Sequence, residues 1–319
     1  MPPRRAILAG ATASLGAMSL GGCVAGRGVT LAPHEVDMPP KGTATLSQSV
    51  MLSGADIGGT HFAAIRACQY PETGVTWFWA MVHTPSGFYQ FASNNVPWNG
   101  PKLTEPDAKI AEYRAKSGKK AQAVYSRAGS LTAPERVTLE AAFDSDGEWG
   151  ADQGRVTVRA EFSPISGFAG LLQGRTEAFG QARFALNIAG KPISFVGPAQ
   201  FHEQSQTSAR FVEPFAFASL WSDGLFSTLL DVPPNSGGYV IDSGRARELK
   251  RAAFELETGA GRAVTVSLLD DGNPASATFE IVRAYGLPLY GNIWRGRFVR
   301  GELFGRPVVG MLNSWLRAA

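Results

Sequence analysis

The chain has 319 residues, of which 44% are hydrophobic and 18% are charged, and this composition excludes bulk disorder. The formal net charge of +3 argues against a nucleic acid partner, which requires a strongly basic surface. The 37 glycines and 20 prolines, together with the scarcity of long helical periodicity, favour an all-β fold of short strands and turns.

The first 22 residues are predicted to be a cleaved signal peptide. Arg4 and Arg5 precede seventeen uncharged residues, a pattern that resembles a twin-arginine signal. The following "LGGC", which ends at Cys23, resembles the lipobox at which bacterial lipoproteins are cleaved and lipidated on the cysteine. The alternative is a short transmembrane anchor, which the length and the Gly, Ala and Ser content disfavour. We expect an exported protein held by lipid on Cys23 at the periplasmic face of the envelope, with Val24 favouring the outer membrane.

Signal cleavage leaves 28 basic and 27 acidic residues, so the mature chain is close to neutral. Lipidation also uses one of the two cysteines, and Cys68 is therefore predicted to be a small buried residue without an intrachain disulfide. Residues 23–50 are rich in Gly, Pro, Ser and Thr and are predicted to form a tether. His34 lies in this tether, which is a poor place for a ligand residue.

The remaining chain repeats itself, which predicts two units, at 51–200 and 201–319. A Gly-basic-Pro turn recurs at Gly190 and Gly305, inside "FALNIAGKPISFVG" and "FVRGELFGRPVVG". Two further pairs precede these turns in the same order. One pair is "WFWAMVHTPSGFYQ" and "FAFASLWSDGLFST", and the looser pair is "AEFSPISGFAG" and "FEIVRAYGLPLYG".

The strands of these units alternate in polarity. In "RVTVRAEF", Val156, Val158, Ala160 and Phe162 share one face, opposite charged and polar residues. Antiparallel hairpins of this kind close as barrels or stack as sandwiches, and two tandem β-barrels are the first choice. An insertion in the first unit is predicted to contain a short helix over residues 106–116.

Three segments resemble a known family. The strands "VGPAQFHEQ" and "VVGMLNSWLR" and the aromatic strand "FAFASLWSDG" are similar to the closing strands and the Trp-rich strand of lipocalin-like tandem-barrel proteins. This family includes carotenoid 1,2-hydratase (hydroxyneurosporene synthase), AttH-type predicted secreted hydrolases and related Diels-Alderases. The resemblance covers about residues 50–319. It implies two tandem lipocalin-like antiparallel barrels and a ligand cavity beside the seam between them.

His202 and Glu203 lie at this predicted seam. A carboxyl group in a dry apolar cavity has a raised pKa and can act as a general acid toward an alkene. The family places its acid before the histidine, whereas His202 precedes Glu203 here. Successive strand residues face opposite sides, so this reversal decides which of them faces the barrel interior. The alternative is an ordinary hydrogen-bonded group of these two residues with Arg210.

Aromatic residues near the seam are the candidates for lining a cavity, and the alternative for most of them is ordinary barrel core. His61 is a further candidate, whereas His83 is expected at the surface of a turn. The predicted ligand-binding set is Trp77, Trp79, Phe201, Arg210, Phe215, Phe217, Trp221 and His61.

The sequence lacks the motifs of other enzyme classes. "HEQSQ" has Gln206 where a zincin needs a second histidine. There is no Gly-x-Ser-x-Gly elbow, and "GAGRAV" from Gly259 is interpreted as a turn. We therefore expect neither a metal nor a cofactor.

Three functional hypotheses stand at this point. The first is an exported lipoprotein that binds a hydrophobic or amphipathic small molecule, such as a lipid or an isoprenoid. The second is a cofactor-independent hydratase or isomerase with Glu203 or His202 as the acid. The third is a structural envelope module that presents loops to another protein.

Overall fold

A computed structural model describes the chain from residue 46 to residue 315 with eight gaps. The described ranges are 46–97, 110–130, 133–165, 174–207, 210–232, 235–257, 262–270, 272–289 and 292–315. The predicted signal peptide, Cys23 and His34 lie outside them. Within these ranges, no helix is both long and apolar enough to span a membrane.

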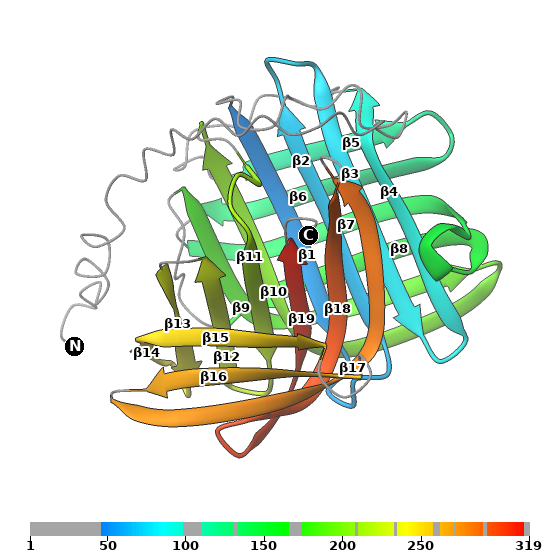
Figure 1. Ribbon diagram of the computed structural model, residues 1–319. Coiled ribbons are helices and arrows are strands. Elements are labelled where there is room, and N and C mark those ends of the chain that lie inside the picture. The colour runs from blue at the N-terminus through cyan, green and yellow to red at the C-terminus, as the bar shows by residue number, and fades with distance from the viewer. Residues whose placement is uncertain are drawn as a thin grey trace. The chain divides into compact units, whose positions relative to one another are not determined.

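The first sheet has ten strands in the order β4-β3-β2-β1-β10-β9-β8-β7-β6-β5 (Figure 1). All of its paired neighbours are antiparallel. A 3-10 helix, η3 (Glu148–Gly150), connects β7 to β8. The strands are β1 (Ser47–Ala55), β2 (Phe62–Tyr70), β3 (Val75–Thr84), β4 (Gly87–Pro97), β5 (Ile110–Ser117), β6 (Ala121–Ser130), β7 (Ala133–Asp146), β8 (Gln153–Pro164), β9 (Arg175–Ile188) and β10 (Lys191–Gln206).

The second sheet has nine strands in the order β14-β13-β12-β11-β19-β18-β17-β16-β15, again antiparallel. The strands are β11 (Phe215–Trp221), β12 (Leu225–Val232), β13 (Asn235–Asp242), β14 (Arg245–Leu249), β15 (Arg251–Glu257), β16 (Ala263–Asp270), β17 (Asn273–Leu289), β18 (Asn292–Leu303) and β19 (Arg306–Trp315).

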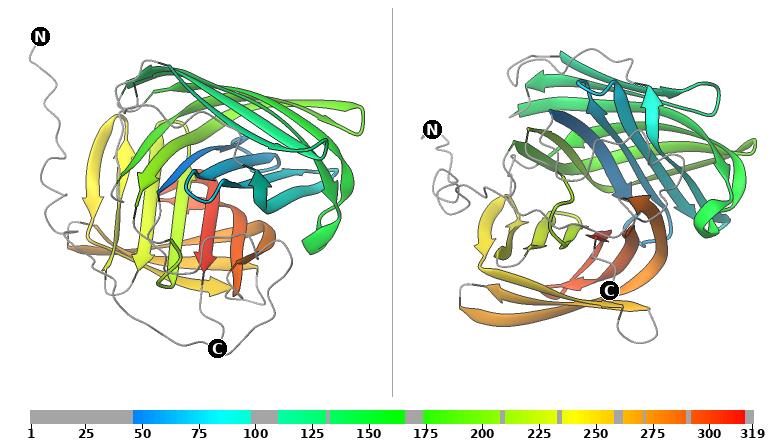
Figure 2. Two further views of the ribbon diagram at one scale, coloured as in Figure 1. Left: turned by 90° about the horizontal axis from the view of Figure 1, so that it is seen from above. Right: turned by 45° about the horizontal axis from the view of Figure 1, so that its top comes forward.

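Both sheets curl into nearly closed barrels (Figure 2). In the first sheet, the edge strand β4 returns to lie near β5 and β7, and in the second sheet β13 returns to lie near β15. Curling in this way protects most of the strand edges. The prediction of an all-β chain with two tandem antiparallel barrels is confirmed.

The strand orders also test the internal repeat. The turns at Gly190 and Gly305 join β9 to β10 and β18 to β19, which occupy equivalent places in the two sheets. Each turn has two residues of positive φ, Ala189 with Gly190 and Phe304 with Gly305, which matches the twist of a tight antiparallel hairpin. The looser pair, in β8 and β17, is also equivalent.

The prediction that the segments beginning at Trp77 and at Phe215 are equivalent in the two repeats is wrong. Trp77 lies in β3, the third strand of its sheet, whereas Phe215 begins β11, the first strand of the other. The counterpart of the Phe215 hairpin is the β1–β2 hairpin. The two hairpins in the prediction share an aromatic composition because both face the same buried layer, which is described below.

Three further expectations are corrected. Residues 110–116 belong to β5 and not to a helix. β1 begins at Ser47, inside the expected tether, and β10 continues to Gln206 because its ladder with β1 extends that far. His83 is the penultimate residue of β3, paired with Phe88 and half-buried, and does not lie at the surface of the turn.

Strand alternation creates three buried clusters. One fills the first barrel, with Phe201 among its residues, and one fills the second barrel. The third cluster, called the inter-sheet layer below, joins the opposite faces of both sheets. It includes Cys68, which is fully buried as predicted. The layer consists of Met51, Ala55, Phe62, Ala64, Cys68, Tyr70, Val75, Trp77, Trp79, Met81, Phe88 and Phe179 from the first sheet, and Trp221, Phe226, Tyr239, Ile241, Tyr285, Leu287, Leu289, Trp294, Phe298, Val309, Met311 and Trp315 from the second.

Candidate binding site between the two sheets

A row of side chains crosses the first sheet on the face toward the inter-sheet layer. The strand registers place Trp79, Arg66, Met51, His202 and Glu177 opposite one another on β3, β2, β1, β10 and β9. Residues that face each other across neighbouring strands lie on the same side of a sheet. Arg66, His202 and Glu177 are therefore carried into an otherwise apolar layer, and each is less than 9% exposed.

Glu177 is the centre of a polar cluster that uses both sheets. Its Oε1 accepts hydrogen bonds from Arg175 Nε at 2.6 Å and from Gln200 Nε2 at 2.9 Å. Its Oε2 accepts from Thr228 Oγ1 at 3.0 Å and from the Tyr239 hydroxyl. Thr228 and Tyr239 are opposite each other on β12 and β13 of the second sheet. The carboxylate thus ties the two sheets together through charge-assisted hydrogen bonds.

His202 is neutral in this cluster. Nη2 of Arg175 lies 3.2 Å from its Nδ1, and because a guanidinium can only donate, Nδ1 accepts and the ring proton is on Nε2. Burial, followed by the charges of Arg175, Arg66 and Arg210, lowers the pKa of His202 well below its ordinary value. Burial also raises the pKa of Tyr239, with the adjacent Glu177 adding to the shift.

The lowered pKa of His202 predicts that the folded protein loses stability as the pH falls. Below about pH 6.5 the unfolded imidazole binds a proton that the folded one rejects, so stability is complete above that pH and falls as the pH decreases, by at most about 1.4 kcal/mol per pH unit. His202→Gln should flatten this slope in urea unfolding followed from pH 7.5 to 5. His83→Gln is the comparison, since burial and then Arg283 lower the pKa of His83 as well, and that ring is only half-buried. An unchanged slope in His202→Gln would contradict the assignment.

Arg66 lacks a carboxylate partner among the residues that the structure describes. Its guanidinium carbon lies 4.6 Å from the centroid of the Trp79 ring, and its Nη1 is buried without a hydrogen bond. Burial, followed by the charges of Arg210 and Arg175, lowers the pKa of Arg66. Burying an unpaired ion costs several kcal/mol, of which a desolvated cation–π contact returns about 2 kcal/mol. Arg66 is therefore an energetic cost to the folded protein.

Two further arginines surround the cluster. Arg175 contacts the ring of Phe217, with 4.8 Å from its guanidinium carbon to the ring centroid. Arg210 is partly exposed, and its partners among the described residues are neutral: it donates to Ser47 Oγ at 2.8 Å, Gln204 Oε1 at 3.3 Å and Ser49 Oγ at 3.5 Å. Neither serine nor glutamine neutralises its charge.

Aromatic rings connect the cluster to the rest of the inter-sheet layer. Five of the six tryptophans that the structure describes lie in this layer. Trp79, which supports Arg66, lies 5.2 Å from Trp294 of the second sheet, and Trp294 lies 6.1 Å from Tyr285. Phe211, in the segment between the sheets, lies 5.8 Å from Trp77 and 5.9 Å from Phe215. The layer is therefore a continuous aromatic surface with a charged group at one place.

Other buried polar atoms on this face also lack partners. Among the described residues they include Ser53 Oγ on β1, the Tyr285 hydroxyl on β17 and Asn313 Oδ1 on β19, in addition to Arg66 Nη1, and the same faces also carry His83 Nδ1, Gln90 Oε1 and Arg283 Nε. The ladders place Asn313 opposite Phe217 and Gly296, and Ser53 opposite Gln200. Folded proteins pair nearly all of their buried polar atoms, so each such atom needs an explanation, and several around one layer indicate a site for a polar ligand group or water.

Gly296 leaves space for Tyr285 in this layer. A Cβ atom added at Gly296 would lie 2.1 Å from a carbon of the Tyr285 ring, which is impossible without movement of that ring. Gly296→Ala should destabilise the protein by about 1–3 kcal/mol, the usual cost of overpacking. Because the three atoms nearest to the added Cβ all belong to Tyr285, Tyr285→Leu should abolish most of the additional cost of Gly296→Ala in a double-mutant cycle. If the destabilising effects of the two substitutions were additive, the close contact between position 296 and Tyr285 would be contradicted.

Glu203 faces the other way from His202. Its Oε1 is 2.6 Å from Nε of Arg127 on β6, and both side chains are at most 7% exposed. Tyr125, two residues before Arg127, and Phe201, two residues before Glu203, belong to the core of the first barrel. The order His-Glu thus sends Glu203 into the first barrel and His202 into the inter-sheet layer.

The other residues predicted to bind a ligand divide into two groups. Trp77, Trp79, Phe215 and Trp221 lie in or against the inter-sheet layer, while Phe217 and Arg210 lie beside its polar cluster. Phe201 and His61 are elsewhere. Phe201 packs inside the first barrel, and the His61 ring is stacked on Phe195 at 5.6 Å, with Nδ1 2.8 Å from Thr60 Oγ1.

Four residues of the cluster were not predicted from the sequence: Arg66, Arg175, Glu177 and Tyr239. One signal for Arg66 was available, because it is the only charged residue in the nine-residue apolar strand "FAAIRACQY". A buried charge in such a strand is expensive and is often functional. Glu177 and Tyr239 had no such signal, because their meeting depends on how two distant strands approach each other.

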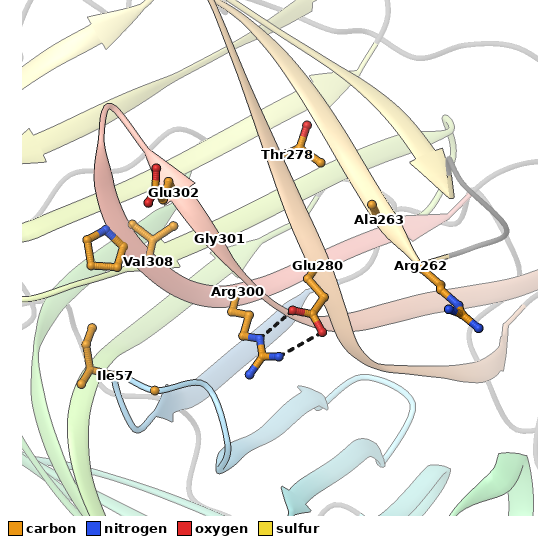
Figure 3. A pocket seen from close by; sticks show the side chains of 11 residues that line it. Ile57, Arg262, Ala263, Thr278, Glu280, Arg300, Gly301, Glu302 and Val308 are labelled. Carbon is orange, nitrogen blue, oxygen red and sulfur yellow. Dashed lines mark hydrogen bonds and ion pairs between the residues drawn. The ribbon is translucent and has the colours of Figure 1, made fainter.

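An open groove elsewhere in the second sheet is a weaker candidate (Figure 3). It is lined by residues of β16 to β19 and by Ile57, Gly58 and Arg262, and two of its charged groups are already paired, with Arg300 donating to Glu280 at 2.8 and 3.0 Å. The described residues also contain no group of His, Cys, Asp and Glu side chains arranged to hold a metal ion.

No protein-family model and no curated protein matches this sequence. Solved structures do match it. The structure of CghA superposes with a TM-score of 0.59 at 11% identity, over 88% of this chain and 93% of CghA. The chain has the tandem lipocalin-like barrel fold. A protein described as AttH from Nitrosomonas europaea superposes with a TM-score of 0.50 at 12% identity, over 93% of this chain and 100% of that one. At such identities the tandem-barrel proteins share the fold with this chain, and their activities are not transferred by it.

Proposed function

We propose that this tandem-barrel protein binds a hydrophobic or amphipathic small molecule, such as a lipid or an isoprenoid, between its two sheets. The observation that carries the proposal is the group of buried polar atoms around an aromatic layer that have no hydrogen-bond partner among the described residues. Small-molecule sites combine an apolar lining with a few polar groups that orient the ligand. Removal of apolar ligand surface from water supplies roughly 25 cal/mol per Å².

The first 23 residues support a second part of the proposal. Their resemblance to a twin-arginine signal and a lipobox supports an exported protein, anchored by lipid on Cys23 at the periplasmic face of the outer membrane. Replacement of Cys23 by Ser should release the protein from the membrane fraction. Equal membrane association of the Cys23→Ser variant would contradict the anchor.

Native mass spectrometry of the protein purified from its own host tests the binding proposal. We expect one bound small molecule per chain, which denaturation releases for identification. The matched variant is Trp79→Ala, which removes an aromatic wall of the layer and should reduce the bound fraction, whereas Trp149→Ala, at an exposed tryptophan, should not. A protein without any bound molecule would favour the structural envelope module instead.

A cofactor-independent hydratase or isomerase is the second candidate. The observation in its favour is that His202, with its proton on Nε2, and the Tyr239–Glu177 pair place proton donors and acceptors in one buried site. General acid catalysis requires such groups within reach of the substrate. If the released molecule is converted by the protein and His202→Gln stops the conversion without releasing the molecule, the enzyme is favoured over the carrier.

A further inference from the structure

The charges that face the inter-sheet layer do not balance. Three guanidinium groups meet near the polar cluster, those of Arg66, Arg175 and Arg210, and each influences the ionisation of His202. Glu177 is the carboxylate of the cluster, and it is bound by Arg175 at 2.6 Å. His202 accepts a hydrogen bond and is neutral. Two positive charges, on Arg66 and Arg210, are therefore left without a carboxylate among the described residues.

The guanidinium of Arg66 lies in buried and largely apolar surroundings. Trp79 covers its guanidinium at 4.6 Å, its neighbours across β1 and along β2 include the apolar Met51, Ala64 and Cys68, and Nη1 is buried without a partner. A planar guanidinium held against an aromatic ring keeps its edge available for a two-point contact with a carboxylate.

Arg210 supplies the second charge. Its three hydrogen bonds to Ser47, Ser49 and Gln204 fix the orientation of the side chain without neutralising it. Ser49 and Gln204 are neighbours in one row of the sheet, next to the row of Arg66 and His202. Arg210 is also the partly exposed member of the cluster, so it is the first positive charge that an incoming anion would meet.

We infer that the ligand is an acid: an apolar chain with one carboxylate that binds the guanidinium of Arg66, with Arg210 nearby as a second positive charge. This inference rests on the proposed function and narrows it to one substrate class. The apolar chain would lie along Trp79, Trp294 and their neighbours, and the carboxylate would supply the missing partner of Arg66. An alcohol or an ester of the same length leaves that charge unpaired.

Quenching of tryptophan fluorescence tests the inference, because most tryptophans of the chain lie in the inter-sheet layer. The full chain is titrated with a polyene fatty acid, its alcohol, its methyl ester and an alkyl phosphate of equal length. We expect the acid to bind at least about tenfold more tightly than the alcohol or the ester, which is the usual effect of one hydrogen bond to a charged group. Arg66→Met should abolish this preference while retaining the affinity for the alcohol.

Three controls make the outcome decisive. Arg66→Met removes no side-chain hydrogen bond to any residue that the structure describes, so the melting temperature of this variant should not fall. Arg66→Lys keeps the charge and should retain part of the preference for the acid, and Arg159→Met, at a side chain that is 69% exposed, should retain all of it.

Each contrary result has its own meaning. Equal binding of acid and alcohol, or an undiminished preference in Arg66→Met, would overturn the inference and leave the proposed function intact. If the alkyl phosphate bound more tightly than the acid, the assignment of the ligand's anionic group as a carboxylate would be overturned. Binding of none of the four probes would overturn the inference, whereas the proposed function stands or falls separately, with the native mass spectrometry described above.

Discussion

Replacement of Glu177 by Gln is expected to lower the free energy of unfolding by about 3–5 kcal/mol, the range for a buried ion pair that loses one partner. The substitution keeps the shape of the side chain but leaves Arg175 buried without its carboxylate. It also places an amide donor among donors from Gln200, Thr228 and Tyr239. Urea unfolding at pH 7.5 measures the loss.

The matched control for Glu177 is Glu280→Gln. Glu280 also accepts hydrogen bonds from an arginine, Arg300, but its side chain is 57% exposed. A surface ion pair contributes about 0–1 kcal/mol, so this control should be nearly neutral. If the two substitutions had equal effects, Glu177 would not join the two sheets as described. Tyr239→Phe should have an intermediate effect of about 1.5–3 kcal/mol, because it removes one hydrogen bond to a charged group.

Arg127→Met is expected to destabilise the protein by a similar amount, about 3–5 kcal/mol, because Glu203 would lose the arginine of its buried ion pair inside the first barrel. The combination of Arg127→Met with Glu203→Leu should recover most of this loss, since a buried ion pair can be replaced by apolar side chains at little cost. Urea unfolding of the two single variants and the double variant measures the coupling. Additive losses would contradict the ion pair.

The Arg127–Glu203 ion pair also bears on whether Glu203 is a structural residue or the acid of a hydratase. Its contact with Arg127 lies on the face of β10 opposite to His202 and the inter-sheet layer. A folded Glu203→Gln variant is therefore expected to retain the bound small molecule, with native mass spectrometry as the measurement. Loss of the molecule, or of its conversion, in this folded variant would instead support Glu203 as the acid of a hydratase.

The sequence predicted those residues of the candidate site that stand out locally in the chain, and it did not predict those that meet only through long-range contacts. Trp77, Trp79 and Trp221 were recognisable because aromatic residues at alternate positions of a strand face one buried side. His202 stood out because histidine is rare in this chain, with four in total. Glu177 and Tyr239 are separated by 62 residues, and no local pattern indicates that two strands of different sheets bring them together.

The sequence by itself determined the β class, the two barrels and the tight turns at Gly190 and Gly305, because alternation and turn chemistry are local properties of the chain. Only the tertiary structure decided which hairpins are equivalent, because that depends on strand order. It also decided that His202 and Glu203 serve different faces, and that Arg66, with no charged partner among the described residues, lies in the same row as His202 and Glu177. Strand register produces that row, and register is set by long-range pairing across the whole sheet.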